Sequence, residues 1–334
     1  MEGFKPPERS PEEEGKSRNY KLESGIDAVV SSKCFYPQKK VPGIESQHNA
    51  IVFLPGLNMD PGASMLKNLG NAYAESSGEE THILKVELSK EAENKKIKEI
   101  DLFYEEALAV SKFIKEKGFS QVTLVGYSIG GPRVINLVHI LQDDSSLNVN
   151  GVILLGSPGL YEQDPGELKK NLLKDSLATP LEVLKRQKVV RSFMRGFNAM
   201  VDVGSSLFIN SLGTDFRIRI KRDFSEMEHF NPRISEIKVP VVVVVGTLDR
   251  VIEVNKIIPP VEIENIQRSV DDSVVLAREK YLKENLFKNS PYVRMVTPTK
   301  MGKHGLPVFR PEQVANVSIG LLQRYHRQDR NNST

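Results

Sequence analysis

The sequence contains little that would insert the chain into a membrane or cross-link it through disulfides. Its one cysteine, Cys34, cannot form a disulfide within the chain, and we expect it to be a small buried hydrophobe. No apolar run approaches the roughly 18 residues of a membrane span, and the opening residues lack the apolar stretch of a secretion signal. These absences argue against a spanning helix and indicate a cytoplasmic location.

Charge of one sign and metal-ligand patterns are also scarce. The formal net charge is +3, from 46 basic and 43 acidic residues, which is too little for a general nucleic-acid binder. The sequence has no H-E-x-x-H and no paired C-x-x-C, so we expect neither a metal nor another cofactor. Five of the six histidines lack a partner pattern, and we interpret them as structural or surface residues: His48, His82, His139, His229 and His326.

The most informative stretch is Gly126-Tyr-Ser-Ile-Gly130. It follows the apolar run 121–125 and precedes a helix-like segment, so strand, motif and helix come in immediate succession. A G-x-S-x-G pentapeptide in this context predicts a sharp turn that lifts the hydroxyl of Ser128 away from the backbone. Glycines flank the serine because side chains there would collide with the neighbouring strand and helix.

This pattern resembles the α/β-hydrolase superfamily, whose parts follow the order nucleophile, acid, histidine. The β-branched run 240–245 reads as a buried strand that delivers Asp249 at its carboxyl end, where the family has its acid. A second short strand at 292–297 is followed by a Gly-punctuated loop carrying His304, at the family's histidine position.

The resemblance implies a catalytic triad. A serine hydroxyl is a poor nucleophile at neutral pH and needs an adjacent base, here His304, to take its proton. Asp249 would fix the histidine tautomer and stabilise the imidazolium that forms. The oxyanion would be held by the backbone amide of Ile129 and by that of Leu57, in the loop after an earlier strand.

Two features depart from the family pattern. Many relatives have His-Gly where this chain has Pro55-Gly56, although the amide donor of Leu57 is unaffected. The spacing from Asp249 to His304 is also long, and we interpret 261–289 as an insertion containing at least one helix.

Each proposed catalytic residue also fits a plainer role. Ser128 is a favoured residue type for a helix N-cap, Asp249 for a turn, and His304 could be a solvated loop residue. Their order behind the expected strands favours the catalytic interpretation.

Alternating strand and helix patterns predict an α/β fold with a doubly covered, mostly parallel sheet and an inserted helical lid. We expect the core at 19–159 and 236–328, the lid at 160–235, and disordered ends at 1–18 and 329–334. Within the core, the patterns predict a hairpin at 20–37, strands at 81–88 and 149–159, and helices at 100–114 and 311–325.

The predicted lid carries a basic amphipathic helix that begins at the capping box Thr179-Pro-Leu-Glu182. Between Lys185 and Arg222 there are nine basic and two acidic residues. Such a helix either makes weak contact with an anionic membrane surface or, more commonly, packs its apolar stripe on the core.

The sequence therefore predicts a cofactor-independent serine hydrolase that acts on a small-molecule ester or thioester. A peptidase, an acyltransferase or a carbon–carbon bond hydrolase would use the same triad. A non-catalytic ligand-binding protein with this fold is the alternative outside enzymes. The oligomeric state is left open.

Overall fold

A computed structural model describes most of the predicted core. The described residues are 17–38, 49–56, 59, 61–89, 101–161, 164, 166–168, 170–171, 227, 233–261, 274–298, 305, 307 and 310–332.

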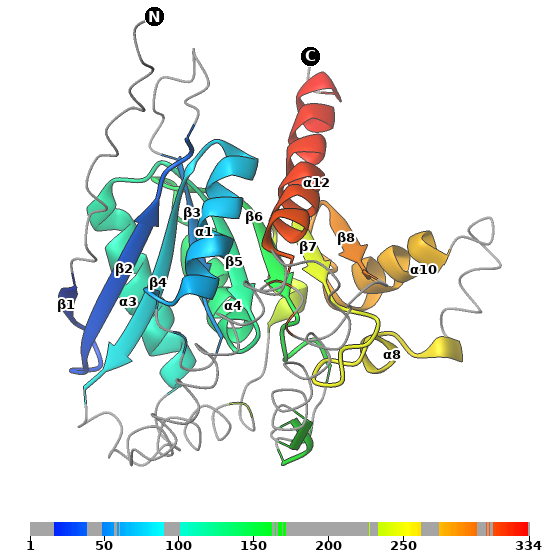
Figure 1. Cartoon of the computed structure of the whole chain (residues 1–334), viewed down its shortest axis with the longest axis horizontal. Helices are drawn as coiled ribbons and strands as arrows, with labels where there is room; N and C mark the ends of the chain where they lie inside the picture. The colour runs from blue at the N-terminus through cyan, green and yellow to red at the C-terminus, as the bar shows by residue number, and fades with distance from the viewer. Residues whose placement is uncertain are drawn as a thin grey trace, which may run out of the picture.

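The described residues form one eight-stranded sheet in the order β1-β2-β4-β3-β5-β6-β7-β8. The pairs β1–β2 and β2–β4 are antiparallel, and every other neighbouring pair is parallel. The arrowheads of β4, β7 and β8 therefore point to the lower side of Figure 1, opposite to that of β2. The strands are β1 Arg18–Lys21, β2 Asp27–Phe35, β3 Asn49–Leu54, β4 Glu80–Leu88, β5 Gln121–Tyr127, β6 Asn148–Leu155, β7 Val241–Val244 and β8 Val293–Val296.

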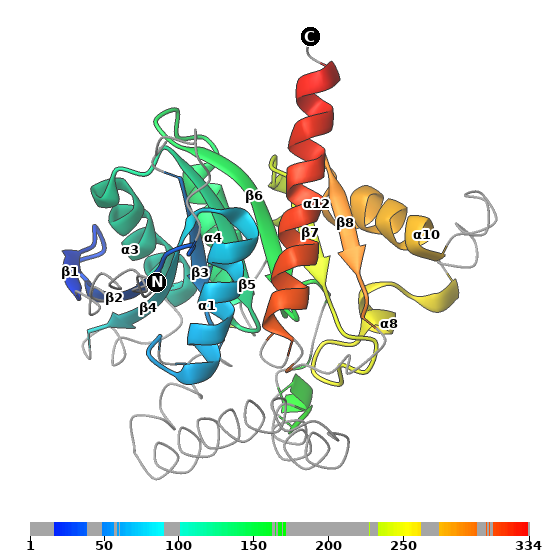
Figure 2. The same cartoon turned by 45° about the horizontal axis from the view of Figure 1, so that its top comes forward.

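Four long helices cover the two faces of this sheet (Figures 1 and 2). The helices α1 (Ser64–Ser77) and α12 (Pro311–Asn332) lie on one face, and α3 (Leu102–Lys117) and α4 (Gly130–Leu141) on the other. Shorter helical segments include η2 Ile234–Glu236, α8 Val254–Ile257, α10 Val274–Tyr281 and the π-helical turn η3 Leu282–Leu286.

Two apolar clusters, one on each face, hold the layers together. Leu66, Leu69 and Tyr73 of α1 pack with α12 against one face of the sheet. Phe113 of α3 and Leu137 of α4 belong to the cluster on the opposite face. The inner strands are buried on both faces, which is why β7 reads as the continuous run Val-Val-Val-Val.

The structure confirms the predicted fold class: a mostly parallel sheet covered by helices on both sides. The predicted hairpin corresponds to β1 and β2, and the predicted insertion at 261–289 contains α10. The N-cap of helix α3 is Asp101, whose side chain accepts a hydrogen bond from the Tyr104 amide, and its C-cap is Gly118, with φ of 71°.

Regular structure reaches beyond both predicted ends of the core. Strand β1 begins at Arg18 and α12 runs to Asn332, so regular structure extends past both predicted boundaries at 19 and 328. The predicted lid at 160–235, including its basic helix, lies almost entirely outside the described residues. In the part of the chain that is described, no helix combines the length and apolar character needed to cross a bilayer.

Candidate active site

The turn between β5 and α4 places Ser128 in a strained backbone conformation. Its φ is 50°, and it is the one non-glycine residue with positive φ in the described part of the chain. The left-handed region costs an L-residue roughly 1–2 kcal/mol. The turn is held by two backbone hydrogen bonds: the Ser128 amide donates to the Leu155 carbonyl of β6, and the Gly131 amide donates to the Ser128 carbonyl, both at 2.9 Å. Backbone strain of this kind is typical of functional sites.

Close packing explains the glycines around the serine. A Cβ on Gly126 would lie 2.7 Å from the Cα of Gly131. A Cβ on Gly130 would lie 2.7 Å from the carbonyl oxygen of Pro55 and would overlap that of Leu54. Helix α4 can therefore start directly behind the serine only because these positions carry no side chain.

Ser157 is a supporting residue that the sequence analysis missed. It is fully buried after β6, its hydroxyl donates to the Gly126 carbonyl at 3.4 Å, and a Cβ on Gly131 would collide with it. It therefore fills the space that the small residue at 131 leaves open. Its position directly after the run 149–156 was the only local signal.

Of the two proposed oxyanion donors, one lies within the described residues and the other does not. The Ile129 amide lies at the N-terminal end of α4, where backbone N–H groups have no partner within the helix and the helix dipole favours negative charge. Leu57 lies outside the described residues, as does Asn58. The residue before them, Gly56, is next to the serine: a Cβ there would be 3.1 Å from the Ser128 Cβ. The loop after β3 thus passes directly beside the β5–α4 turn.

Asp249 follows β7 and is held rigidly. Its side chain is 6% exposed, and its Oδ1 accepts hydrogen bonds from the amides of Val251 (2.8 Å) and Ile252 (2.9 Å). Its own amide donates to the Gly246 carbonyl at 3.0 Å. Strands β5, β6 and β7 are consecutive and parallel, so Ser128 and Asp249 both emerge at the carboxyl edge of the sheet, from strands roughly 10 Å apart.

Tyr161 is a second neighbour that the sequence analysis missed. Its hydroxyl accepts a hydrogen bond from the Glu253 amide at 3.3 Å, in the segment just after Asp249. Burial raises the pKa of Tyr161 above 10.0, although the hydrogen bond from the Glu253 amide and the charge of Lys256 act in the opposite direction. The start of the predicted lid therefore lies close to the acid loop.

His304 lies outside the described residues, but the segment that leads to it does not. The amide and the hydroxyl of Thr247 donate to the Pro298 carbonyl at 3.3 and 3.2 Å. Thr247 is two residues before Asp249, and Pro298 is six residues before His304. The chain that carries the histidine thus leaves β8 beside the loop that carries the aspartate.

One group of described residues has the composition of a metal site, and it is not at this edge of the sheet. Cys34, Glu80 and His82 bring one donor atom each to within 4.8 Å of one another. The expectation that Cys34 is a small buried hydrophobe is wrong, because its side chain is half-buried and its sulfur faces polar groups.

Comparison with known proteins finds this fold in solved structures. A thermophilic esterase from Thermogutta terrifontis matches with a TM-score of 0.54 and 11% identity, over 93% of this chain and 99% of that one. An esterase from Exiguobacterium antarcticum matches with a TM-score of 0.52 and 12% identity, over 92% and 100%. Est816, an N-acyl homoserine lactone degrading enzyme, matches with a TM-score of 0.53 and 18% identity, over 91% and 99%.

No family model matches the chain, and no curated protein matches its sequence. At identities of 11–18% the structural matches establish the fold, and the chain has the fold of the α/β-hydrolases. The resemblance inferred from the Ser128 motif is confirmed at this level.

Proposed function

We propose that the chain is a serine hydrolase that cleaves a carboxylic ester or thioester through an acyl-enzyme on Ser128. One observation carries the proposal. A serine with φ of 50° occupies the turn between a buried parallel strand and a helix whose first residues are glycines without room for a Cβ. An ordinary helix N-cap has φ and ψ in the extended region, so capping α4 does not explain this conformation.

In the proposed reaction, the Ser128 oxygen attacks the substrate carbonyl carbon while His304 takes the hydroxyl proton. Asp249 holds the imidazole and stabilises its charged form. The negative oxygen of the tetrahedral intermediate accepts hydrogen bonds from the amides of Ile129 and Leu57. His304 then gives the proton to the departing alcohol or thiol. In the second half of the reaction, water attacks the acyl-enzyme and releases the acyl group from Ser128 as a carboxylic acid.

Three described features support this assignment. Ser128 and Asp249 emerge at the same edge of the sheet, and both backbones are fixed by hydrogen bonds. The Thr247–Pro298 hydrogen bonds hold Pro298, six residues before His304 in the sequence, beside the loop that carries Asp249. The matching structures include two esterases and an enzyme that degrades a lactone, and the last substrate is a cyclic ester.

Labelling with a fluorophosphonate tests whether Ser128 is an activated nucleophile. The reagent should modify Ser128 and block turnover of p-nitrophenyl esters from acetate to palmitate. Ser128→Ala should lose both labelling and several orders of magnitude in turnover. Ser120→Ala is the matched control, because Ser120 precedes the same strand at its opposite end.

The same assay separates the alternatives. A non-catalytic binding protein would leave the serine unlabelled, and near-normal turnover by Ser128→Ala would exclude Ser128 as the nucleophile. Among active outcomes, preference for short acyl chains would indicate an esterase, and preference for long chains would indicate a lipid substrate. Labelling without turnover of any ester would favour an amide or carbon–carbon substrate and would refute the ester assignment.

A further inference from the structure

We propose a second site in this protein: a zinc site formed by Cys34, Glu80 and His82, at the edge of the sheet opposite to Ser128. The backbone brings the three residues together. Cys34 of β2 is directly opposite His82 of β4 in the antiparallel register, and Glu80 precedes His82 by two residues. Residues two apart on a strand share a face, and directly opposed residues do too, so all three side chains lie on one face of the sheet.

The donor atoms of the three side chains converge. The Cys34 Sγ is 3.5 Å from the His82 Nε2, the Nε2 is 3.2 Å from the Glu80 Oε1, and the Sγ is 4.0 Å from the Glu80 Oε2. Tetrahedral zinc binds sulfur at about 2.3 Å and nitrogen or oxygen at about 2.0–2.2 Å, which spaces the donor atoms roughly 3.3–3.6 Å apart. Small side-chain movements would therefore bring all three into coordination.

The chemistry of the three ligands favours a borderline or soft divalent ion. A thiolate and an imidazole exclude calcium and magnesium, which prefer all-oxygen sites. A thiolate, a carboxylate and a neutral imidazole carry a charge of −2, so a divalent ion leaves a neutral site. The Cys34 thiol must release its proton to solvent when the ion binds.

The surroundings fix one ligand and leave access to another. The His82 side chain is 2% exposed and packs against the rings of Phe113 and Phe119, so its ring orientation is set before an ion arrives. The Glu80 side chain is 30% exposed. Solvent can therefore reach the site from the Glu80 side, and water can fill the fourth coordination position.

The second ring nitrogen of His82 limits the affinity of the site for zinc. The His82 Nδ1 is buried without a hydrogen-bond partner among the described residues. Zinc-bound histidines usually donate this second N–H to a carboxylate or carbonyl group. We therefore expect zinc to bind roughly 10–100-fold more weakly than at a site whose histidine is anchored in this way.

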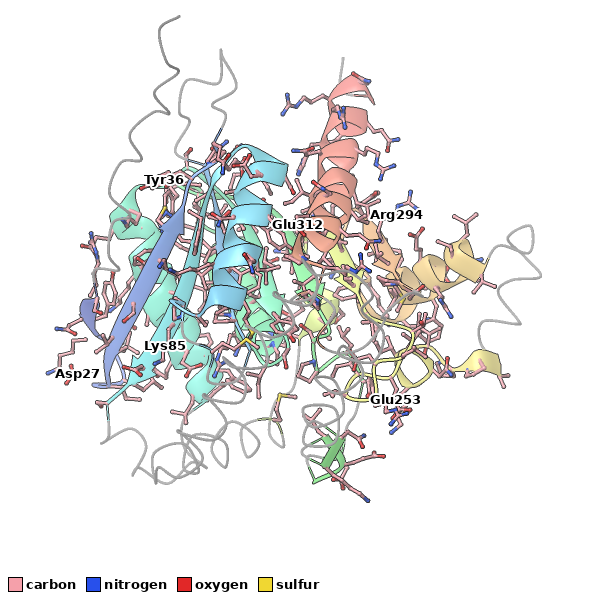
Figure 3. All side chains as sticks on the ribbon, in the orientation of Figure 1. Asp27, Tyr36, Lys85, Glu253, Arg294 and Glu312 are labelled. Carbon is pink, nitrogen blue, oxygen red and sulfur yellow. The ribbon has the colours of Figure 1, made fainter. Side chains whose placement is uncertain are left out.

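The site is far from the proposed catalytic serine. Glu80 pairs with Ala50 of β3, Ala50 pairs with Val122 of β5, and Ser128 lies six residues further along that strand, about 20 Å away. In Figure 3, Tyr36 and Glu253, the labelled residues nearest in sequence to Cys34 and Asp249, lie well apart, at the upper left and the lower right of the view. The ion would join β2 to β4 and would take no part in ester hydrolysis.

The single cysteine makes the test specific, because any thiolate–metal signal must come from Cys34. The untagged full chain is reduced, stripped with a chelator and titrated with Co²⁺, while the thiolate-to-cobalt charge-transfer absorption is recorded. Competition with Zn²⁺ then gives the zinc affinity. The expected result is one ion per chain, with zinc slowing alkylation of Cys34 and raising the melting temperature.

Three variants decide the assignment. Cys34→Ser should abolish the charge-transfer absorption, and Glu80→Gln should weaken zinc binding by at least about tenfold, since loss of an outer partner alone costs this much. Glu87→Gln, on the same strand but outside the site, should bind zinc as the wild type does. If Cys34→Ser does not fold, Glu80→Gln decides the matter, because its side chain is partly exposed.

No charge-transfer absorption in the wild type, or zinc binding that is unchanged in Glu80→Gln, would overturn the proposal. Ester hydrolysis is measured alongside and should be the same with and without zinc. Loss of the zinc site and failure of the hydrolase assignment are thus distinguishable.

Discussion

The strain at Ser128 can be measured by comparing two variants that remove the same hydroxyl. Ser128→Ala keeps a Cβ in the left-handed region, whereas Ser128→Gly removes it. At most positions alanine is the more stable of the two by roughly 0.5–1 kcal/mol, because glycine loses more conformational freedom on folding. At φ of 50° we expect the reverse order.

The magnitude follows from two opposing contributions. Placing a Cβ in the left-handed region costs about 1–2 kcal/mol, and the greater freedom of glycine in the unfolded chain offsets about 0.4–1 kcal/mol. Ser128 is half-buried, so loss of its Cβ contacts removes only a little more. Ser128→Gly should therefore exceed Ser128→Ala in free energy of unfolding by about 0.5–1 kcal/mol, or about 1 °C in melting temperature for a chain of this size.

Urea unfolding of both variants, followed by circular dichroism, measures this difference through the midpoints. The same pair of substitutions at Ser120 is the control, because its φ is not positive, and there the alanine variant should be at least as stable. If the glycine and alanine variants rank in the same order of stability at Ser128 and at Ser120, the strain argument is refuted. Both Ser128 variants should lose turnover by several orders of magnitude, so activity and stability are separated.

Three further predictions concern other residues. Gly130→Ala should destabilise the fold by about 1–3 kcal/mol in urea unfolding, because its Cβ meets backbone oxygens, whereas Gly320→Ala in α12 meets nothing and should stabilise by about 0.5–1 kcal/mol. Asp249→Asn keeps an oxygen for both amide hydrogen bonds, so its melting temperature should be near normal while turnover falls about 10⁴-fold; a normal rate would remove Asp249 from the mechanism. Burial, and next the charge of Arg233, lower the pKa of His139 from 6.5 in the folded chain. As the pH falls, the His139 imidazole is therefore protonated in the unfolded chain before it is protonated in the folded one. The free energy of unfolding should fall as the pH drops below about 6.5. Unfolding midpoints between about pH 7.5 and about pH 5.5 should depend less on pH in His139→Gln than in the wild type. An unchanged dependence would show that His139 is not the source of the pH effect.

Local patterns made much of the candidate site predictable. The G-x-S-x-G motif, its strand and its helix are contiguous, so the turn at Ser128 can be anticipated from neighbouring residues alone. The same is true of Asp249, which lies a few residues after the apolar run that forms β7. Both predictions depend on a strand that ends where its hydrophobic run ends, a relation that holds in parallel sheets covered on both faces.

The contacts that support the site could not be anticipated in this way. Gly56 approaches Ser128 because β3 is the neighbour of β5, and Ser157 fills the space beside Gly131 because β6 is the next strand. Tyr161 reaches Glu253, in the segment after Asp249, from a point 92 residues earlier in the chain. These relations follow from strand order, which hydrophobic periodicity does not determine.

The cluster of Cys34, Glu80 and His82 shows the same limit at the other edge of the sheet. A metal motif is recognised in sequence when its ligands are close together, as in C-x-x-C. Here only Glu80 and His82 are close, and a pair of residues with i, i+2 spacing is common in any strand. Cys34 joins them because β2 pairs with β4 instead of β3, its neighbour along the chain. Since this pairing lies about 20 Å from Ser128, changes to the cluster should alter stability and leave ester turnover unchanged.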